Sequence, residues 1–196
     1  MKWIVGVDEV GRGPVAGPVY VCAFACEVEH VDGIVAGIKT PLRDSKKLTK
    51  KMRHAWFEYL HTLAKEKKVR YIMTKASNTE IDDKGIDVCI RAAVNNCLEK
   101  LALDLTETKV FLDGGLYAHP KFVQETLVKG DENIPVIALA SIVAKVTRDK
   151  EMDELAKTHD KYAWEKNKGY GTKAHMDAIK EYGVTPLHRV SFLKHV

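Results

Sequence analysis

The stretch VGVDEVGRGPVAG, residues 5–17, is the part of the sequence that decides the fold. A short apolar run leads into two adjacent carboxylates, Asp8 and Glu9, and Arg12 follows between two glycines. The apolar run predicts a β-strand, and the flanking glycines predict a loop whose backbone can approach another molecule closely. We therefore expect a strand that brings negative charge to its end, beside an arginine presented by a loop.

Two further interpretations of this loop have to be weighed. The segment GRGPVAG is similar to the G-x-G-x-x-G loop that binds dinucleotides, but its third glycine comes one position late. Pro14 stands where the helix should begin to donate amides, and Asp8 and Glu9 would repel a pyrophosphate, which disfavours a dinucleotide site. For the loop considered alone, a tight turn with a solvated Arg12 stays open beside an Arg12 that contacts a phosphate or sugar.

The composition is typical of a globular protein with one core. The 196 residues are 45% hydrophobic and 30% charged, which predicts a single domain over residues 1–196. The formal charge of +4 permits a polyanionic partner without requiring one.

Nothing in the sequence indicates export or a membrane. The apolar part of MKWIVGVDE is too short for a signal peptide, and the longest apolar stretch, residues 134–146, is too short to cross a bilayer. The four cysteines include no CxxC pair, which predicts reduced core thiols in the cytosol and disfavours a zinc site. We expect a cytoplasmic protein.

The hydrophobic pattern predicts alternating strands and helices, and therefore an α/β fold. Strands are expected at residues 3–7, 18–28, 69–76, 109–113 and 122–131, the last two ending on Asp113 and Asp131. Helices are expected from Thr49 to about Glu66, from Asn78 to about Leu101, over residues 134–162, and from Lys173 to Tyr182.

Four carboxylates fall at the ends of these expected strands: Asp8, Glu9, Asp113 and Asp131. Such ends commonly line one crevice of an α/β sheet, where the charges would repel one another unless a cation joined them. An all-oxygen set favours a hard ion, Mg²⁺ or Mn²⁺. For any single aspartate, capping a helix or binding turn amides is the better explanation. For the four together we favour a metal site.

Seven segments occur in an order that resembles ribonuclease HII over nearly the whole chain. They are DEVGRGPVAGPV, DSKKLT, FLDGG, LVKGD, ASIVAKVTRD, NKGYGT and TPLHRVSF. The related ribonuclease HIII typically has GKG in place of GRG and an extra N-terminal domain. The GRG segment, and a start directly at the expected catalytic strand, favour type HII. Val10 stands where the family often has alanine.

The resemblance implies a ribonuclease H-like fold, which is a central mixed β-sheet flanked by helices, with extra C-terminal helices. The catalytic residues that it implies, which would bind Mn²⁺ or Mg²⁺, are Asp8, Glu9, Asp113 and Asp131. The implied substrate-reading loop is Gly11, Arg12 and Gly13, and the implied junction-sensing residue is Tyr170 in NKGYGT.

The reaction that the resemblance implies is hydrolysis of the RNA strand of RNA–DNA hybrids, leaving 3′-hydroxyl and 5′-phosphate ends. We also expect nicking on the 5′ side of single ribonucleotides in duplex DNA, which would suit their removal from the genome. We expect a monomer, and no clamp-binding tail is evident after HRVSFLKHV. A different metal-dependent nuclease is the alternative, and a non-catalytic binding module is disfavoured because its carboxylates would repel phosphate.

Several basic residues are candidates for phosphate contacts. Lys46, in DSKKLT, is the preferred one. A solvated helix start explains Lys47, Lys50, Lys51 and Arg53 equally well. Lys145 and Arg148 could serve a substrate groove or brace nearby acids, and we interpret His188 as structural.

Overall fold

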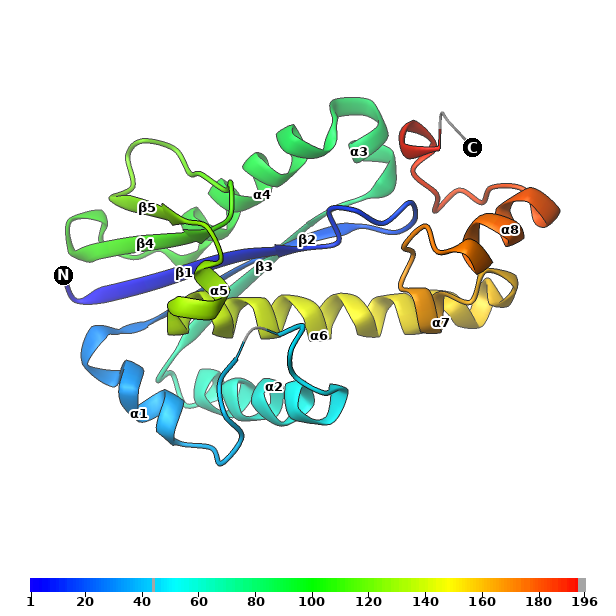
Figure 1. The fold of residues 1–196 in the computed structure, drawn as a ribbon. Coiled ribbons are helices and arrows are strands. Elements are labelled where there is room, and N and C mark those ends of the chain that lie inside the picture. The colour runs from blue at the N-terminus through cyan, green and yellow to red at the C-terminus, as the bar shows by residue number, and fades with distance from the viewer. Residues whose placement is uncertain (44, 194–196) are drawn as a thin grey trace.

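The fold is organised around a five-stranded mixed sheet, in a computed structural model that describes residues 1–43 and 45–193 (Figure 1). The strands are β1 (Trp3–Val10), β2 (Val19–Glu27), β3 (Arg70–Ala76), β4 (Thr108–Asp113) and β5 (Gln124–Leu127). Their order is β3-β2-β1-β4-β5, with β1 antiparallel to β2 and parallel to β4. The opening stretch therefore forms the central strand, and the predicted fold class is confirmed.

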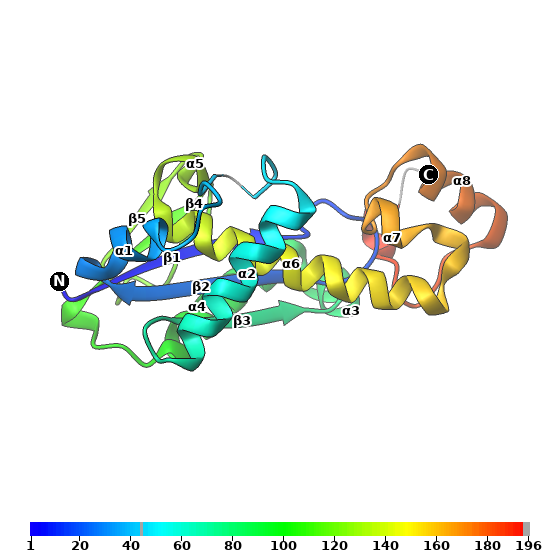
Figure 2. The ribbon, with the colours of Figure 1, turned by 90° about the horizontal axis from the view of Figure 1, so that it is seen from below.

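Helices cover both faces of this sheet. They are α1 (Val31–Ala36), α2 (Lys50–Lys65), α3 (Asn78–Lys84), α4 (Ile86–Leu101), α5 (Gly130–Asn133), α6 (Pro135–Thr158), α7 (Trp164–Asn167) and α8 (Lys173–Tyr182). The two views show α3 and α4 on one face and α2 and α6 on the other (Figures 1 and 2). The sheet is thus the middle layer of three.

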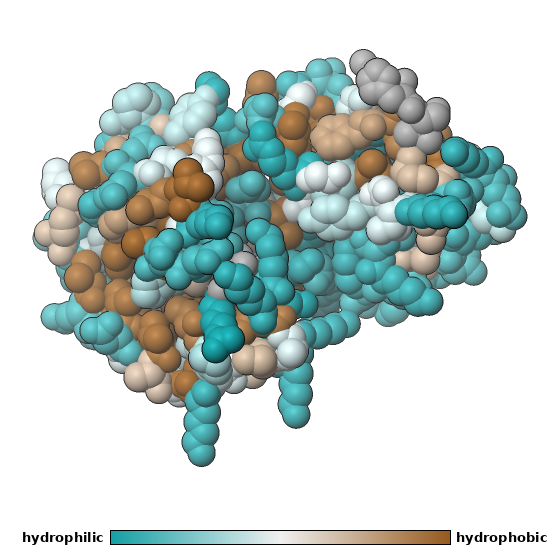
Figure 3. Space-filling model, viewed as in Figure 1, coloured by the Kyte–Doolittle hydropathy of each residue, from teal (hydrophilic) through white to brown (hydrophobic). Residues whose placement is uncertain are grey.

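Each face of the sheet has its own hydrophobic cluster, as the alternation of side chains along a strand requires. A third cluster lies beyond the sheet, where the last turns of α6 pack with α7 and α8 around Met152 and Trp164. Ala16, in the loop after β1, is buried in this third cluster. The loop therefore connects the sheet to the C-terminal helices, whose surface in Figure 3 is mainly hydrophilic.

Helix α6 lies directly on β1 because the strand has a glycine at the crossing. A Cβ built at Gly6 would stand 2.1 Å from the carbonyl carbon of Val136, far inside van der Waals contact. Only glycine admits the helix backbone at this distance. The contact brings the first half of α6, which includes Ser141, beside the end of β1.

One predicted helix is in fact two. The pattern predicts a helix from Asn78 to Leu101, but Gly85, with φ +84°, separates α3 from α4. The N-cap is Ser77, whose hydroxyl accepts a hydrogen bond from the N–H of Glu80. Asn78 is instead buried, and its amide donates to the carbonyl groups of Pro186 and His188.

Two other boundaries also differ from the prediction. The strand predicted over residues 122–131 ends at Leu127, because Lys129 has a left-handed conformation (φ +57°) that turns the chain into α5. Asp131 is therefore a helix residue and not a strand end. The helix predicted over residues 134–162 ends at Thr158.

Other predictions are confirmed. Thr49 caps α2 by accepting from the N–H of Met52, and α8 spans Lys173–Tyr182. All four cysteines are buried and free. In the described part of the chain, no helix is both long enough and apolar enough to cross a membrane. Asp44 and the final residues 194–196 of HRVSFLKHV lie outside the described residues.

Candidate active site

The two adjacent carboxylates of β1 belong to opposite faces of the sheet. Asp8 is paired with Cys22, which packs in the cluster of α6, whereas Glu9 is paired with Val21, which packs in the cluster of α4. Directly paired residues of antiparallel strands share a face. Asp8 is buried and Glu9 half-buried, so β1 carries one carboxylate to each side of its exposed end.

Asp113 joins Asp8 from the neighbouring strand. β1 and β4 run parallel, and the residues just before Asp8 and Asp113 are in register. One oxygen of Asp113, Oδ1, accepts hydrogen bonds from the backbone N–H groups of Gly130 (2.7 Å) and Asp131 (3.4 Å). These bonds fix α5 against the end of β4 and place the buried Asp131 beside Asp113.

Lys46 lies over this group. Its Nζ is 4.0 Å from Oδ2 of Asp131, although its side chain is 79% exposed. Burial raises the pKa of Glu9, and the charge of Lys46 is one of those that oppose this rise. The adjacent Lys47 pairs with Glu132 of α5 at 2.9 Å. Lys46 is therefore the lysine of DSKKLT that is in range of two of the predicted carboxylates.

The carboxylates disturb one another electrostatically. Burial raises the pKa of Asp8 well above its usual range, and the charges of Glu9 and Asp113 raise it further. Burial also raises the pKa of Glu9, and Asp113 adds to this, whereas Arg12 and Lys46 oppose it. The site thus concentrates more negative charge than its own basic residues neutralise.

Such a donor set fits a hard divalent ion, because it offers only oxygen ligands and an uncompensated negative charge. Over residues 1–43 and 45–193, the only three metal-ligating side chains whose ligand atoms all lie within 4.8 Å of one another are Glu27, Glu29 and His30. That group is beside the start of β1 and not at its end. The carboxylates at the end of β1 are therefore spaced more widely.

Two hydroxyl groups lie beside Asp8, and no motif in the sequence indicates this role. Burial raises the pKa of Asp8, and the hydroxyl of Ser141 in α6 lies close enough to oppose part of that rise. Ser45 lies 2.8 Å from Ser141, oxygen to oxygen, and both residues are buried. The two hydroxyl groups are hydrogen-bonded to each other, and either can be the donor. The link ties the DSKKLT segment to α6.

The GRG loop and Tyr170 lie side by side. Gly11 has φ +90°, and a Cβ there would stand 2.2 Å from Nε of Arg148, so glycine is required. A Cβ built at Gly13 would be 3.7 Å from Cε1 of Tyr170. Tyr170 is 41% exposed and lies on the turn between α7 and α8, an irregular segment as predicted. The structure thus places an exposed aromatic ring next to the loop.

A buried histidine pair fixes the backbone of Tyr170. Nδ1 of His175 lies 2.9 Å from the Tyr170 carbonyl oxygen and donates to it. Nε2 of His175 then accepts from Trp164 (3.0 Å) and from His188 (3.1 Å), whose own Nδ1 accepts from the N–H of Thr185 (2.8 Å). This assignment uses both histidines in the neutral form. His188 is structural, as predicted.

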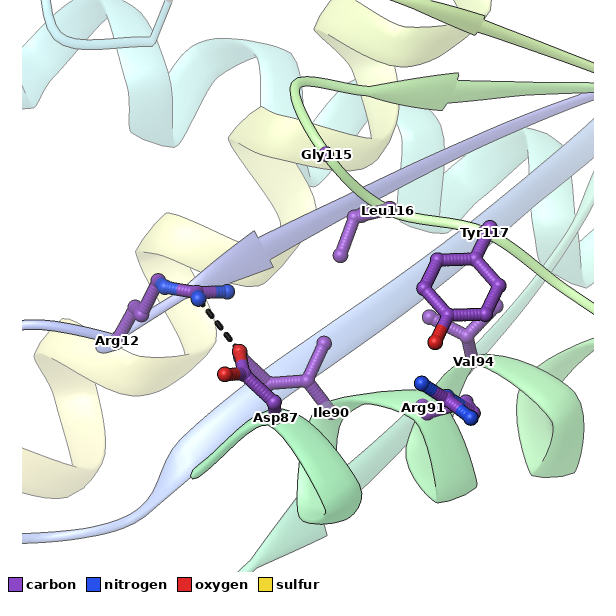
Figure 4. A pocket seen from close by; sticks show the side chains of 8 residues that line it. All are labelled: Arg12, Asp87, Ile90, Arg91, Val94, Gly115, Leu116 and Tyr117. Carbon is purple, nitrogen blue, oxygen red and sulfur yellow. Dashed lines mark hydrogen bonds and ion pairs between the residues drawn. The ribbon is translucent and has the colours of Figure 1, made fainter. Parts of the chain in front are cut away.

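Arg12 extends from the loop towards α4. Its guanidinium pairs with Asp87 at 2.5 Å, and the two side chains border a pocket of about 250 Å³ between α4 and the segment after β4 (Figure 4). On the far side, the Arg91 guanidinium lies 4.3 Å from the centre of the Tyr117 ring. The Arg12 side chain is half-exposed and already has an acidic partner.

Two basic residues of ASIVAKVTRD behave differently from each other. Lys145 braces a local acid, Asp149, at 2.8 Å on the next turn of α6. Arg148 neither lines a substrate groove nor braces an acid, the two roles predicted for it. It is fully buried and donates to backbone carbonyl groups of Ala16, Pro18 and Lys168. Its hydrophilic character gave no signal of burial.

This strand order, with carboxylates where β1 and β4 end, is that of the ribonuclease H-like fold. A superposition on a solved structure of this fold covers 95% of this chain, so it includes the helices on both faces of the sheet. The chain belongs to the ribonuclease HII family, whose sequence model matches residues 5–195. Membership of this family supports an endonuclease that degrades RNA in RNA–DNA hybrids.

The similarity extends over the whole chain. A ribonuclease HII from Clostridium perfringens (strain SM101 / Type A) is 41% identical over 195 residues, which cover 100% of this chain and 68% of that protein. The fold is similar to that in the PCNA:RNase HII complex from Archaeoglobus fulgidus (TM-score 0.74, 23% identity, 95% and 93% coverage). It also resembles Bst-RNase HIII in complex with Mn²⁺ (TM-score 0.63, 20% identity, 92% and 63% coverage).

Proposed function

We propose that this protein hydrolyses the RNA strand of RNA–DNA hybrids and nicks duplex DNA on the 5′ side of single embedded ribonucleotides. The products would carry 3′-hydroxyl and 5′-phosphate ends. The observation that carries the proposal is the arrangement around the end of β1, where the GRG loop and Tyr170 flank the strand that bears Asp8 and Glu9. One region would thus both recognise and cut the substrate.

The residues that would bind divalent ions are Asp8, Glu9, Asp113 and Asp131. If they held Mg²⁺ or Mn²⁺, the ion would supply activation of a water molecule and stabilisation of charge on the departing 3′-oxygen. The chain's own contribution is orientation: Ser141 fixes Asp8, and the N–H groups of Gly130 and Asp131 fix Asp113. We propose that residues 1–196 act as one catalytic domain, because these groups come from across the chain.

Recognition of the ribonucleotide would fall to the loop and to Tyr170. Backbone groups of Gly11, Arg12 and Gly13 can reach a 2′-hydroxyl in the minor groove, where an RNA sugar differs from a DNA sugar. The exposed Tyr170 ring would lie against the deoxyribose that follows the ribonucleotide. Lys46, largely exposed above Asp131, would contact a phosphate.

The test uses three end-labelled duplexes of the same sequence: one with a single ribonucleotide, one an RNA–DNA hybrid and one all DNA. We expect Mg²⁺- or Mn²⁺-dependent cleavage of the first two and none of the third. The single cut in the first should leave a 5′-phosphate on the ribonucleotide, which a 5′-phosphate-dependent exonuclease detects. Equal cleavage of the all-DNA duplex would contradict the proposal.

A further inference from the structure

Two arginines are fully buried beneath the loop that follows β1. Arg148 comes from α6 and Arg189 from the C-terminal TPLHRVSF segment, and both have 0% exposure. In the described ranges, no carboxylate lies within 4 Å of either guanidinium. Burial, and then the charge of Arg148, lowers the pKa of Arg189 to about 9. Burying two cations without an anion is costly, so their other contacts must compensate.

The side-chain hydrogen bonds of Arg189 all go to backbone carbonyl oxygens of this loop. Its Nη2 donates to Gly11 (2.7 Å), its Nη1 to Arg12 (3.0 Å) and its Nε to Gly17 (2.9 Å). Arg148 contacts other carbonyl groups, those of Ala16, Pro18 and Lys168. The planar fork of Arg189 therefore holds the two peptide groups of the GRG segment, and Arg148 does not.

The direction of these carbonyl groups decides where the neighbouring N–H groups point. In a trans peptide, C=O and the following N–H point in opposite directions, and the chain has no cis peptide in its described part. Because the carbonyl groups of Gly11 and Arg12 point inward at Arg189, the N–H groups of Arg12 and Gly13 point outward. Neither N–H donates a hydrogen bond to any described residue.

The segment that carries Arg189 is itself firmly attached. Asp82 of α3 accepts hydrogen bonds from the N–H groups of Val190 (2.8 Å) and Ser191 (2.9 Å). The N–H of Arg189 donates to the carbonyl of Val15 at 2.8 Å. These contacts fix the backbone on both sides of the guanidinium, so the fork has a defined position under the loop.

We propose that Arg189 is a positioning residue, which orients the two GRG peptide groups so that the N–H groups of Arg12 and Gly13 donate to the 2′-oxygen of the ribonucleotide. The inference rests on the proposed function, and it adds the reason why the loop discriminates. Arg189 touches no substrate and acts through the loop alone. A lysine cannot replace it, because an ammonium group lacks the planar fork that spans two carbonyl groups.

The test compares Arg189→Lys with the matched variant Arg148→Lys on two duplexes that differ only in a 2′-hydroxyl or a 2′-fluorine at the cleavage position. Arg189→Lys should lower kcat/KM for the 2′-hydroxyl substrate by roughly ten- to a hundredfold. It should lower kcat/KM for the 2′-fluorine substrate far less, because fluorine accepts hydrogen bonds poorly. Arg148→Lys should lower both by the same factor. Circular dichroism confirms that each variant is folded.

If Arg189→Lys lowered kcat/KM for both substrates by the same factor, the positioning role would be overturned. It would also be overturned if Arg148→Lys lost as much discrimination between the substrates as Arg189→Lys. If Arg189→Lys does not fold, Asp82→Ala provides the second test, since it loosens the segment and leaves the guanidinium intact. It should reduce discrimination between the two substrates, and unchanged discrimination would overturn the proposal. Wild-type protein that fails to cut the hydroxyl substrate would instead refute the proposed function.

Discussion

At Asp113, a substitution can remove the proposed catalytic charge and still keep the hydrogen bonds that support the fold. Its Oδ1 accepts the two N–H groups that attach α5, and the amide oxygen of asparagine can accept them as well. Asp113→Asn should therefore keep the melting temperature within a few degrees of wild type. Its activity should fall by more than the roughly 10- to 100-fold that loss of an outer ligand partner costs.

The check is a cleavage assay with Mg²⁺ alongside a thermal melt, and Asp32→Asn, an exposed residue of α1, is the control. Near-normal cleavage by Asp113→Asn would remove Asp113 from the catalytic set.

Tyr170 is a second residue whose removal should affect the substrate and not the fold. Its side chain is partly exposed, whereas its backbone is held by Asn167, Thr172 and His175. Tyr170→Ala should lose most activity on a single embedded ribonucleotide and less on a long hybrid, with Tyr170→Phe intermediate. The measurement is the cleavage rate of each variant on both substrates, together with its melting temperature. If Tyr170→Ala lowered both rates by the same factor, or did not fold, Tyr170 would be a structural residue.

At the scale of elements, the crossing of α6 over β1 depends on one missing side chain. A Cβ at position 6 meets the backbone of Val136, which cannot move away as a flexible side chain could. Gly6→Ala should destabilise the protein by about 3 kcal/mol or more. Gly33→Ala in α1 is the control: a Cβ there meets nothing within 4 Å and should stabilise by up to about 1 kcal/mol.

Urea denaturation of both variants gives the two free energies of unfolding. A Gly6→Ala protein as stable as wild type would show that α6 and β1 adjust to a larger spacing.

The buried histidine pair makes the contact between α8 and the C-terminal segment sensitive to acid. Burial lowers the pKa of His175, and burial and the nearby His175 lower that of His188 to about 4. Because the unfolded histidines take up protons near pH 6.5 and the folded ones do not, stability should be full above that pH and fall progressively towards pH 4.

The measurement is the melting temperature between pH 8 and pH 5 for wild type, His188→Gln and the control His54→Gln, an exposed position. The decline below pH 6.5 should be smaller in His188→Gln and unchanged in His54→Gln. Identical profiles for all three proteins would contradict this account.

The elements show how far hydrophobic pattern carries a prediction. The stripe of α4 and the cap at Thr49 were predictable because they depend on residues close in sequence. The break at Gly85 was missed because the apolar stripe continues across it. Asn78 was assigned as a cap because capping is local, whereas its real partners, at Pro186 and His188, are more than 100 residues away.

At the scale of the whole molecule, some residues of the candidate site are predictable from local sequence pattern and others are not. Asp8, Glu9 and Asp113 could be singled out because they follow apolar runs. Asp131 could be singled out too, but its place in a helix depends on a backbone turn at Lys129 that side-chain pattern does not reveal. The buried arginines were beyond prediction, because charged residues normally lie at the surface and only distant carbonyl groups explain the exception.

Divalent ions should stabilise the whole molecule, since the carboxylates of β1, β4 and α5 meet only in the folded state. At about 100 times its dissociation constant, an ion adds about 2.7 kcal/mol, which for a chain of this size is roughly 5–10 °C in melting temperature. We expect this shift with Mg²⁺ or Mn²⁺, and its reversal by EDTA. Ca²⁺ should give the shift with poor turnover.

Asp8→Asn should reduce the shift, and the exposed Asp32→Asn should not. A shift of equal size in Asp8→Asn would place the ion elsewhere on the protein.

The contact between Arg189 and Arg12 also bears on how the protein is made. The two residues are 177 positions apart, so the loop after the first strand gains this support only after residue 189 has left the ribosome. A nascent chain can therefore display Asp8 and Glu9 early in synthesis without yet having an ordered recognition loop. Ribosome-bound intermediates that end before residue 189 should accordingly discriminate poorly between a ribonucleotide and a deoxyribonucleotide.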